Sequence, residues 1–569
     1  MLTDTILPSP DIERAADTRR ALLVLLGLLV WRTIAVIVSP LDLGPDEAQY
    51  WRWGQSFDWG YYSKPPLIAW VIGSVTQVFG DTAWAVRLPA PFLHTLVGGL
   101  VFAIGRTMQD ARTGFYAVLI YALMPGVTFS SGLMTTDSVL FVPWTLGLLL
   151  LWHMRSGRSS WQMALALGLA IGAGFLAKYA MIYFVLGLAL TVIIDAPTRQ
   201  AFSKRNLLLT LLGALVLLAP HISWNISHDL QTLSHTADNA NWEDDLFHPD
   251  HAIKFLVDQM GVFGPVSFMA LVTGIFVTLR GKAQAEDAAG RWLICFALPA
   301  LLVILAQAVT SRAHANWAAT AYIAGSLLVA RWMVSEHVLA RPVWYVGGGL
   351  LLVAAAFVPD LSFLARAGLG SVLGLVLIGL GAVSAWRVRG LLWSGLVIHV
   401  MAALAFTALA AGPVHWSETA GLANAFKRTR GWVETVRSLS DIADQHGARA
   451  IMVDERENWH GLDFYGQGVL TMPVYTWQRY RTAKSYADLH PLPEDAAGPV
   501  LIASVRKRFR PHICADFGRI VALDPLAIPL GGQSQRQFHL YLGYEYQPLN
   551  RTADWDARFA SDQNAVEAC

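Results

Sequence analysis

The stretch ALLVLLGLLVWRTIAVIVSPLDLGPDEAQYW, residues 21–51, places a long apolar run shortly before two adjacent carboxylates, Asp46 and Glu47. As a helix, residues 21–38 are long enough to cross a hydrocarbon core of roughly 30 Å. The segment SPLDLGPDE that follows lacks a small-x-small cleavage site, so we interpret the run as a retained span and not as a signal peptide. The stretch therefore predicts a membrane protein with an acidic pair at a membrane surface.

The composition of the whole chain supports this prediction. The 569 residues are 54% hydrophobic and only 15% charged, and the mean hydropathy is +0.43, above that of ordinary soluble proteins. A net charge of +1 without a Lys/Arg-rich tract argues against a nucleic-acid partner. The sequence also lacks a GxxxxGK[ST] phosphate loop, so ATP-driven transport has no support.

We expect an all-α polytopic membrane domain over residues 1–411 with about thirteen transmembrane helices. With the N-terminus in the cytoplasm, the Arg and Lys residues of the short loops fall inside, and residues 39–85 and 224–255 form outer loops. The run at 67–80 is short for a span and is predicted to be an interfacial helix. The predicted spans are 20–38, 86–105, 112–128, 137–153, 161–177, 179–194, 207–223, 256–279, 292–310, 314–333, 342–358, 367–385 and 391–411.

The composition changes after residue 411. Charges become frequent, and short β-like runs such as ARAIMVD (448–454) and GPVLIASV (498–505) alternate with helical stretches. We therefore expect a soluble, mixed α/β domain over residues 412–569, on the outer side of the membrane. Cys295 lies in an apolar run, where packing is its default role, and pairing of Cys514 with Cys569 is left open.

Several ionisable residues fall near the outer ends of the predicted spans. Mixed charges that gather on one face of a membrane domain favour a cavity for an anionic ligand. A carboxylate there can take a proton from an acceptor hydroxyl, and ammonium or guanidinium groups can stabilise a phosphate. Taken singly, each has a structural alternative: snorkelling, a turn, or the cap of a helix. The candidates are Asp46, Glu47, Lys64, Asp137, Lys178, Arg312 and His314.

The second outer loop and its flanks are rich in potential metal ligands, but no HExxH motif or close pair of cysteines organises them. We interpret this segment as a surface loop. A divalent metal ion stays an open alternative, and its ligands are unknown. The residues concerned are His221, His228, Asp229, His235, His248, Asp250 and His251.

Four motifs follow one another in a recognisable order: PDEAQYW (45–51), YYSKPPL (61–67), FGDTAWAVRLP (79–89) and LMTTDSVLF (133–141). In this order they resemble the membrane glycosyltransferases of the GT-C fold, and in particular the protein O-mannosyltransferase superfamily with its bacterial lipid A aminoarabinose transferases. The resemblance extends from Arg32 to about Tyr322. It implies inverting transfer of one sugar from a polyprenyl-phosphate donor to a lipid or glycan acceptor at the periplasmic face.

The resemblance also implies roles for individual residues. Asp46 matches the proposed catalytic base with Glu47 as its neighbour, although the residues alone do not say which acid takes the proton. Lys64, Lys178 and Arg312 match donor-phosphate contacts. Positioning of substrate or metal falls to Asp137, Tyr50, Tyr62 and His314.

The chain departs from the aminoarabinose branch at two positions. That branch has Glu where this chain has Ser63, and Arg shortly after the acidic pair, where this chain has Gln49 followed by Tyr50. The departures predict a different sugar or a changed metal site. Sugar, acceptor and oligomeric state are left open, and the alternatives are a protein O-glycosyltransferase and a flippase or transporter of a lipid-linked saccharide. Mostly apolar mid-span positions disfavour transport.

Overall fold

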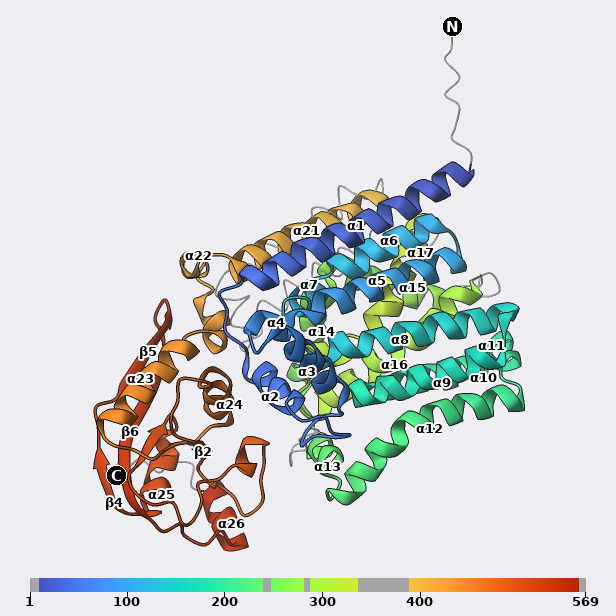
Figure 1. The fold of residues 1–569 in the computed structure, drawn as a ribbon. Coiled ribbons are helices and arrows are strands. Elements are labelled where there is room, and N and C mark those ends of the chain that lie inside the picture. Colours follow the sequence, from blue (N-terminus) through green and yellow to red (C-terminus); the bar gives the residue numbers. More distant parts are fainter. Residues whose placement is uncertain (1–9, 239–246, 281–286, 336–387, 562–569) are drawn as a thin grey trace. The chain divides into compact units, whose positions relative to one another are not determined.

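The computed structural model describes residues 10–238, 247–280, 287–335 and 388–561 (Figure 1). The chain divides into two compact units, each of which collects segments distant in sequence. Unit 1 contains residues 1–37, 64–68 and 87–408, and unit 2 contains residues 38–63, 69–86 and 409–569. The domain boundary at residues 411/412 stays a prediction.

Unit 1 is built from helices. Helix α9 packs between α8 and α12, and α5 packs against α6 and α8. Six helices in the described part of the chain are long and apolar enough to cross a membrane, or seven if one bent pair is a single span. The α-helices of unit 1 are α1 (Pro10–Val38), α5 (Pro89–Met108), α6 (Ala111–Leu123), α7 (Pro125–Ser130), α8 (Thr136–His153), α9 (Trp161–Ala177), α10 (Ile182–Ile194), α11 (Ala196–Ala201), α12 (Lys204–Ser227), α13 (Gln231–Asp238), α14 (Pro249–Phe263), α15 (Pro265–Arg280), α16 (Ala288–Thr310), α17 (Ala321–Ser335) and α21 (Val388–Ala411).

These helices agree with most of the predicted spans. The span predicted at 161–177 coincides with α9. The span predicted at 112–128 is divided between α6 and α7, because Pro125 has no amide N–H with which to continue the helix. The spans predicted at 342–358 and 367–385 lie outside the described residues. The polytopic helical architecture is confirmed, and the count of thirteen stays a prediction.

One predicted span is wrong as a single helix. Residues 256–279 form the end of α14 and most of α15, and the two helices meet at an angle of 113°. Gly264 has φ +88° and ψ 142°, a conformation that only glycine adopts readily. Pro265 then begins the next helix at its first position, where the missing N–H is not needed. The sequence Gly-Pro therefore breaks the apolar run.

Unit 2 contains one mixed sheet of six strands in the order β2-β1-β3-β6-β4, with β5 paired to β6. The β1–β2 and β1–β3 pairs are parallel, and β6 is antiparallel to β3, β4 and β5. The sheet confirms a C-terminal domain that mixes helices and strands. The strands are β1 (Ala450–Val453), β2 (Val474–Thr476), β3 (Val500–Ser504), β4 (Phe517–Ala522), β5 (Leu526–Gly531) and β6 (Ser534–Tyr546).

Both faces of this sheet are covered. Successive residues of β1 point to opposite faces, so Ile451 packs in one apolar cluster with Trp459 while Met452 packs in the other with Trp477. The α-helices that lie wholly or mostly in unit 2 are α2 (Pro45–Gly54), α3 (Leu67–Phe79), α4 (Ala83–Arg87), α22 (Val414–Thr419), α23 (Trp432–Gln445), α24 (Arg456–Tyr465), α25 (Arg510–Cys514) and α26 (Ala553–Ser561). Cys514 ends α25, and Cys569, whose pairing with Cys514 is left open, lies outside the described residues.

Most of the segment predicted as the first outer loop, residues 38–63 and 69–86 but not 64–68, belongs to the same compact unit as this domain. Helix α2 packs against α24, with the rings of Trp51 and Phe464 in edge contact at 4.8 Å. Asp42 Oδ2 accepts a hydrogen bond of 2.8 Å from the backbone N–H of Trp432. The hydroxyl of Tyr465 accepts one of 2.6 Å from the N–H of Leu43. The acidic pair is therefore positioned by contacts with residues near the other end of the chain.

Candidate functional site

Helix α2 carries the acidic pair in its first turn. Gly44 is extended at the N-cap and Pro45 has a φ already suited to the first helical position. The side chain of Glu47 turns back, and its Oε2 accepts a hydrogen bond of 2.9 Å from the N–H of Gly44. Glu47 is only 4% exposed. This carboxylate closes the start of the helix, a role that is structural and leaves it poorly placed to meet a substrate.

Asp46 has the opposite environment. Its side chain is 61% exposed, and its Oδ1 accepts a hydrogen bond of 3.4 Å from Arg456 Nη2. Arg456 begins α24 and also donates to Gln49 Oε1 at 3.4 Å. Exposure leaves the second carboxylate oxygen accessible to a proton donor. Of the two acids, Asp46 is therefore the one whose carboxylate is accessible.

The two departures from the aminoarabinose branch are neighbours in space. Gln49 Nε2 donates to Ser63 Oγ at 3.5 Å, and both side chains are buried. A neutral contact therefore stands where the resemblance leads one to expect an acid and a base. Tyr50 is buried with its ring 5.5 Å from that of Trp53, and Tyr62 donates to the carbonyl of Ala483 at 2.7 Å. These contacts place both tyrosines in the packing of unit 2.

In unit 1, Asp137 joins two other polar residues. Its Oδ1 pairs with Lys178 Nζ at 2.7 Å, and its Oδ2 accepts a hydrogen bond of 2.9 Å from Asn316 Nδ2. The helix cap that sequence analysis considered for Asp137 is made instead by Thr135, whose hydroxyl accepts from the N–H of Ser138 at 3.2 Å. The carboxylate of Asp137 is thus left for the ion pair, which ties the start of α8 to the end of α9.

Asp137 also lines a cavity of about 590 Å³ within unit 1. Its walls are largely apolar, and Asp137, His314 and Asn316 supply polar groups at one part of its lining. Helices α7, α8, α14 and α21 and the segment 314–319 before α17 contribute to it. Its other lining residues are Met124, Pro125, Gly126, Thr128, Phe129, Ser130, Thr135, Phe141, Gly261, Val262, Ala315, Ala319, Ala402 and Phe406. An apolar cavity with a few convergent polar groups suits an amphiphilic ligand.

The remaining predicted cations differ in environment. Lys64 is half-buried directly before Pro65 and Pro66. Arg312 is exposed and forms no ion pair with the residues that the structure describes. The ring centroid of His314 lies 5.1 Å from that of Trp317.

Sequence reasoning missed Arg456 entirely, because nothing in VDEREN (453–458) points to a partner more than 400 residues upstream.

The potential metal ligands of the sequence are mostly separated in the structure. His221 lies in α12 and forms a hydrogen bond of 2.8 Å with the hydroxyl of Tyr179, and His228 stacks on Trp224. In the described part of the chain, only His248, Asp250 and His251 come close enough together to hold a metal ion.

Residues 63–224 match the family described as dolichyl-phosphate-mannose-protein mannosyltransferase. Lipid A galacturonosyltransferase RgtD from Rhizobium johnstonii is 34% identical over 317 residues, which are 56% of this chain and 66% of that protein. An undecaprenyl phosphate-alpha-4-amino-4-deoxy-L-arabinose arabinosyl transferase from Pseudomonas fluorescens is 28% identical over 45% of this chain and 47% of its own. The crystal structure of ArnT from Cupriavidus metallidurans bound to undecaprenyl phosphate superposes with a TM-score of 0.61, at 16% identity, over 91% of this chain and 97% of that chain.

The chain has the GT-C fold and is related to these glycosyltransferases. The resemblance found in the four motifs is thereby confirmed. The structural likeness to ArnT establishes the fold, and the sequence matches cover less than two thirds of the length of either relative.

Proposed function

We propose that this protein transfers a single sugar from a polyprenyl-phosphate donor to lipid A or another part of lipopolysaccharide, at the periplasmic face of the inner membrane. The observation that carries the proposal is the apolar cavity of about 590 Å³ with Asp137 in its lining. A polyprenyl phosphate has a long apolar chain and an anionic head, which is the kind of ligand this lining suits. The relatives named above, whose names specify lipid A and undecaprenyl phosphate, support the same class of substrates.

In the proposed reaction, an acceptor hydroxyl attacks the anomeric carbon of the donor. The bond between that carbon and the phosphate oxygen breaks, the new glycosidic bond forms, and the polyprenyl phosphate leaves. The hydroxyl proton passes to Asp46, whose exposed carboxylate accepts it. A single displacement of this kind inverts the anomeric configuration. The hydrogen bond from Arg456 orients this carboxylate before the proton arrives.

The departing phosphate needs positive charge, which we assign to Lys64, Lys178 and Arg312. Lys178 already pairs with Asp137, but its ammonium has three N–H donors and this bond uses one of them. Arg312 is exposed and presents a charged guanidinium. Asp137 then acts as a positioning residue that fixes the Lys178 ammonium.

The proposal includes the topology expected from the sequence: thirteen spans, a cytoplasmic N-terminus and a periplasmic C-terminal domain. It leaves the sugar to be decided by experiment. The names of the relatives include a galacturonosyl and an aminoarabinosyl transferase, and the neutral Gln49–Ser63 contact favours a donor other than the aminoarabinosyl one. A protein acceptor is the second candidate, because the matching family is described by protein mannosylation.

The test compares Asp46→Asn with Glu47→Gln. Lipid A, core oligosaccharide and total envelope protein from cells that lack the gene are analysed by mass spectrometry after complementation with each form. We expect wild type to add one sugar and Asp46→Asn to lose the activity by about 10²- to 10⁴-fold, the usual contribution of a general base. Because Asp46 is exposed, Asp46→Asn should leave the unfolding temperature unchanged, whereas Glu47→Gln perturbs the helix cap.

The competing functions give different results. A flippase needs two compartments, so purified protein in detergent micelles would form no product from donor and acceptor, and the proposal would be refuted. A sugar found on envelope protein alone would establish the second candidate. Full complementation by Asp46→Asn, with a normal unfolding temperature, would show that Asp46 is not the base.

A further inference from the structure

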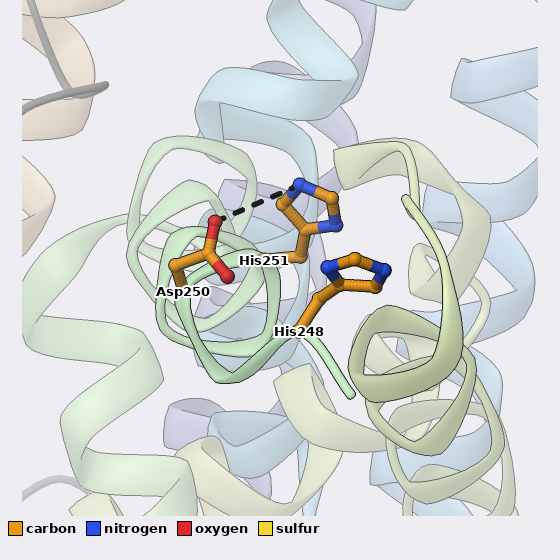
Figure 2. Close-up of side chains that lie close together, drawn as sticks. All are labelled: His248, Asp250 and His251. Atoms are coloured by element: carbon orange, nitrogen blue, oxygen red, sulfur yellow. Dashed lines mark ion pairs between the residues drawn. The ribbon is translucent and has the colours of Figure 1, made fainter. Parts of the chain in front are cut away.

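The side chains of His248, Asp250 and His251 lie close together at the start of α14 (Figure 2). One ligand atom from each lies within 4.8 Å of the ligand atoms of the other two. The two imidazole rings are stacked with their centroids 4.8 Å apart and their planes inclined by 25°. His251 Nε2 lies 3.7 Å from Asp250 Oδ2. Two nitrogens and a carboxylate oxygen therefore converge on one small volume.

The backbone around this cluster is anchored to the end of the neighbouring helix α16. The N–H of His248 donates to the carbonyl of Val309 at 2.7 Å, which connects the residue before α14 to the end of α16. His251 Nδ1 lies 3.3 Å from the carbonyl of Ser311. Because a carbonyl only accepts hydrogen bonds, this contact places the proton on Nδ1 and leaves the Nε2 lone pair directed toward the cluster. A backbone carbonyl on the far ring nitrogen is the usual support of a metal-binding histidine.

We propose that His248, Asp250 and His251 bind a divalent transition-metal ion of the zinc class. Bonds of about 2.0–2.2 Å to nitrogen and oxygen in a tetrahedral site put neighbouring ligand atoms about 3.4 Å apart. The Asp250–His251 separation of 3.7 Å is close to this value, and the ligand atom of His248, which lies within 4.8 Å of the other two, reaches it by a side-chain adjustment of at most about 1.4 Å. Two imidazoles favour Zn²⁺ over Mg²⁺ or Ca²⁺, which take oxygen ligands.

The exposure of the cluster determines its coordination. The side chains of Asp250 and His251 are 52% and 38% exposed, so a fourth position is accessible to water or to an anionic group. The bound ion would also strengthen the connection between the start of α14 and the end of α16. This inference goes beyond the proposed transferase activity and is independent of it, because it concerns metal binding by the protein without substrates.

The test is calorimetric titration of Zn²⁺ into the full-length protein, purified in detergent without a polyhistidine tag and stripped with a chelator. The variants are His248→Ala, Asp250→Asn and His251→Ala. Matched controls are His228→Ala and Asp229→Asn, since neither residue belongs to the cluster. Co²⁺ titrations followed by visible absorption report the coordination geometry, and thermal unfolding with and without Zn²⁺ reports whether each variant is folded.

We expect one site per chain, weakened by about tenfold or more in each cluster variant, with the two controls unchanged. Zn²⁺ should raise the unfolding temperature of wild type and of the controls but not of His251→Ala. A tetrahedral Co²⁺ spectrum is expected, and millimolar Mg²⁺ should not compete. Equal Zn²⁺ affinity in wild type and His251→Ala, no Zn²⁺ binding by wild type, or displacement by Mg²⁺ would each overturn the proposal.

Discussion

The Asp137–Lys178 ion pair should be strongly coupled in a double-mutant cycle. Its Nζ–Oδ1 distance is 2.7 Å, and the side chains of Asp137 and Lys178 are 10% and 19% exposed. At an effective dielectric constant of about 20, two unit charges at this distance attract by about 6 kcal/mol. Desolvation of the two ions offsets much of that attraction, and removal of one partner from a buried pair costs about 3–5 kcal/mol.

The measurement uses Asp137→Ala, Lys178→Ala and the double variant, unfolded by denaturant in detergent. Each single variant leaves an uncompensated charge and should lose about 3–5 kcal/mol. The double variant leaves none, so its loss should fall short of the sum by about 2–3 kcal/mol. Losses that add to within about 0.5 kcal/mol would show that the two groups do not interact, and would refute the reasoning.

A second ion pair of unit 1 provides the control. Arg155 and Asp195 lie 2.8 Å apart with both side chains 12% exposed, and neither lines the cavity. Breaking this pair should destabilise the protein by a similar amount while sugar transfer by the folded fraction is retained. If Asp137 positions Lys178 for catalysis, breaking their pair should lower turnover even at temperatures where the variant is fully folded. Equal effects on activity from the two pairs would assign Asp137 a structural role.

Three further outcomes are expected. Gly264→Ala should destabilise unit 1 by about 2 kcal/mol or more, because a side chain is strained at φ +88° and its Cβ would meet the His399 ring. Thermal unfolding tests this expectation, and an unchanged unfolding temperature would contradict it. Burial raises the pKa of Asp463 to about 6, so the folded state holds this proton more tightly than the unfolded chain does. Unfolding free energy should therefore fall as pH rises from about 4 to about 6, by up to about 3 kcal/mol, and Asp463→Asn should remove that decline, which a pH series of denaturant unfolding curves would detect. Asp516→Asn should cost about 3–5 kcal/mol, measured by denaturant unfolding with tryptophan fluorescence, because it leaves the buried Arg551 guanidinium without its carboxylate; a loss below about 1 kcal/mol would argue against a charged pair.

The helical membrane architecture was predictable because the length and polarity of a span depend only on consecutive residues of the sequence. The run 161–177, for example, became α9 at those limits. The break at Gly264 was missed, although Gly followed by Pro is a strong local signal for the end of a helix. The apolar residues on both sides of this pair made the segment resemble one continuous span. Hydropathy counts how many residues avoid water and does not register the direction of the backbone.

The candidate site was predictable only in part. The motifs identified Asp46, Asp137 and Lys178 as notable, but they did not say that the last two pair directly. The difference in exposure between Asp46 and Glu47 depends on orientation within one helical turn, since adjacent residues on a helix point about 100° apart. Arg456 was invisible because its contact depends on the packing of α24 against α2, a tertiary arrangement with no local signature.

The association of the first outer loop with the C-terminal domain has a consequence for biosynthesis. The hydrogen bond between Asp42 and Trp432 joins residues 390 positions apart. At about 5–20 residues per second, translation reaches Trp432 roughly 20–80 s after Asp42 has been made. During that interval α2 and its acidic pair lack the surface on which they pack, so the enzyme should become competent only once synthesis is nearly complete. The order of synthesis would thus prevent an incompletely translated chain from catalysing the reaction.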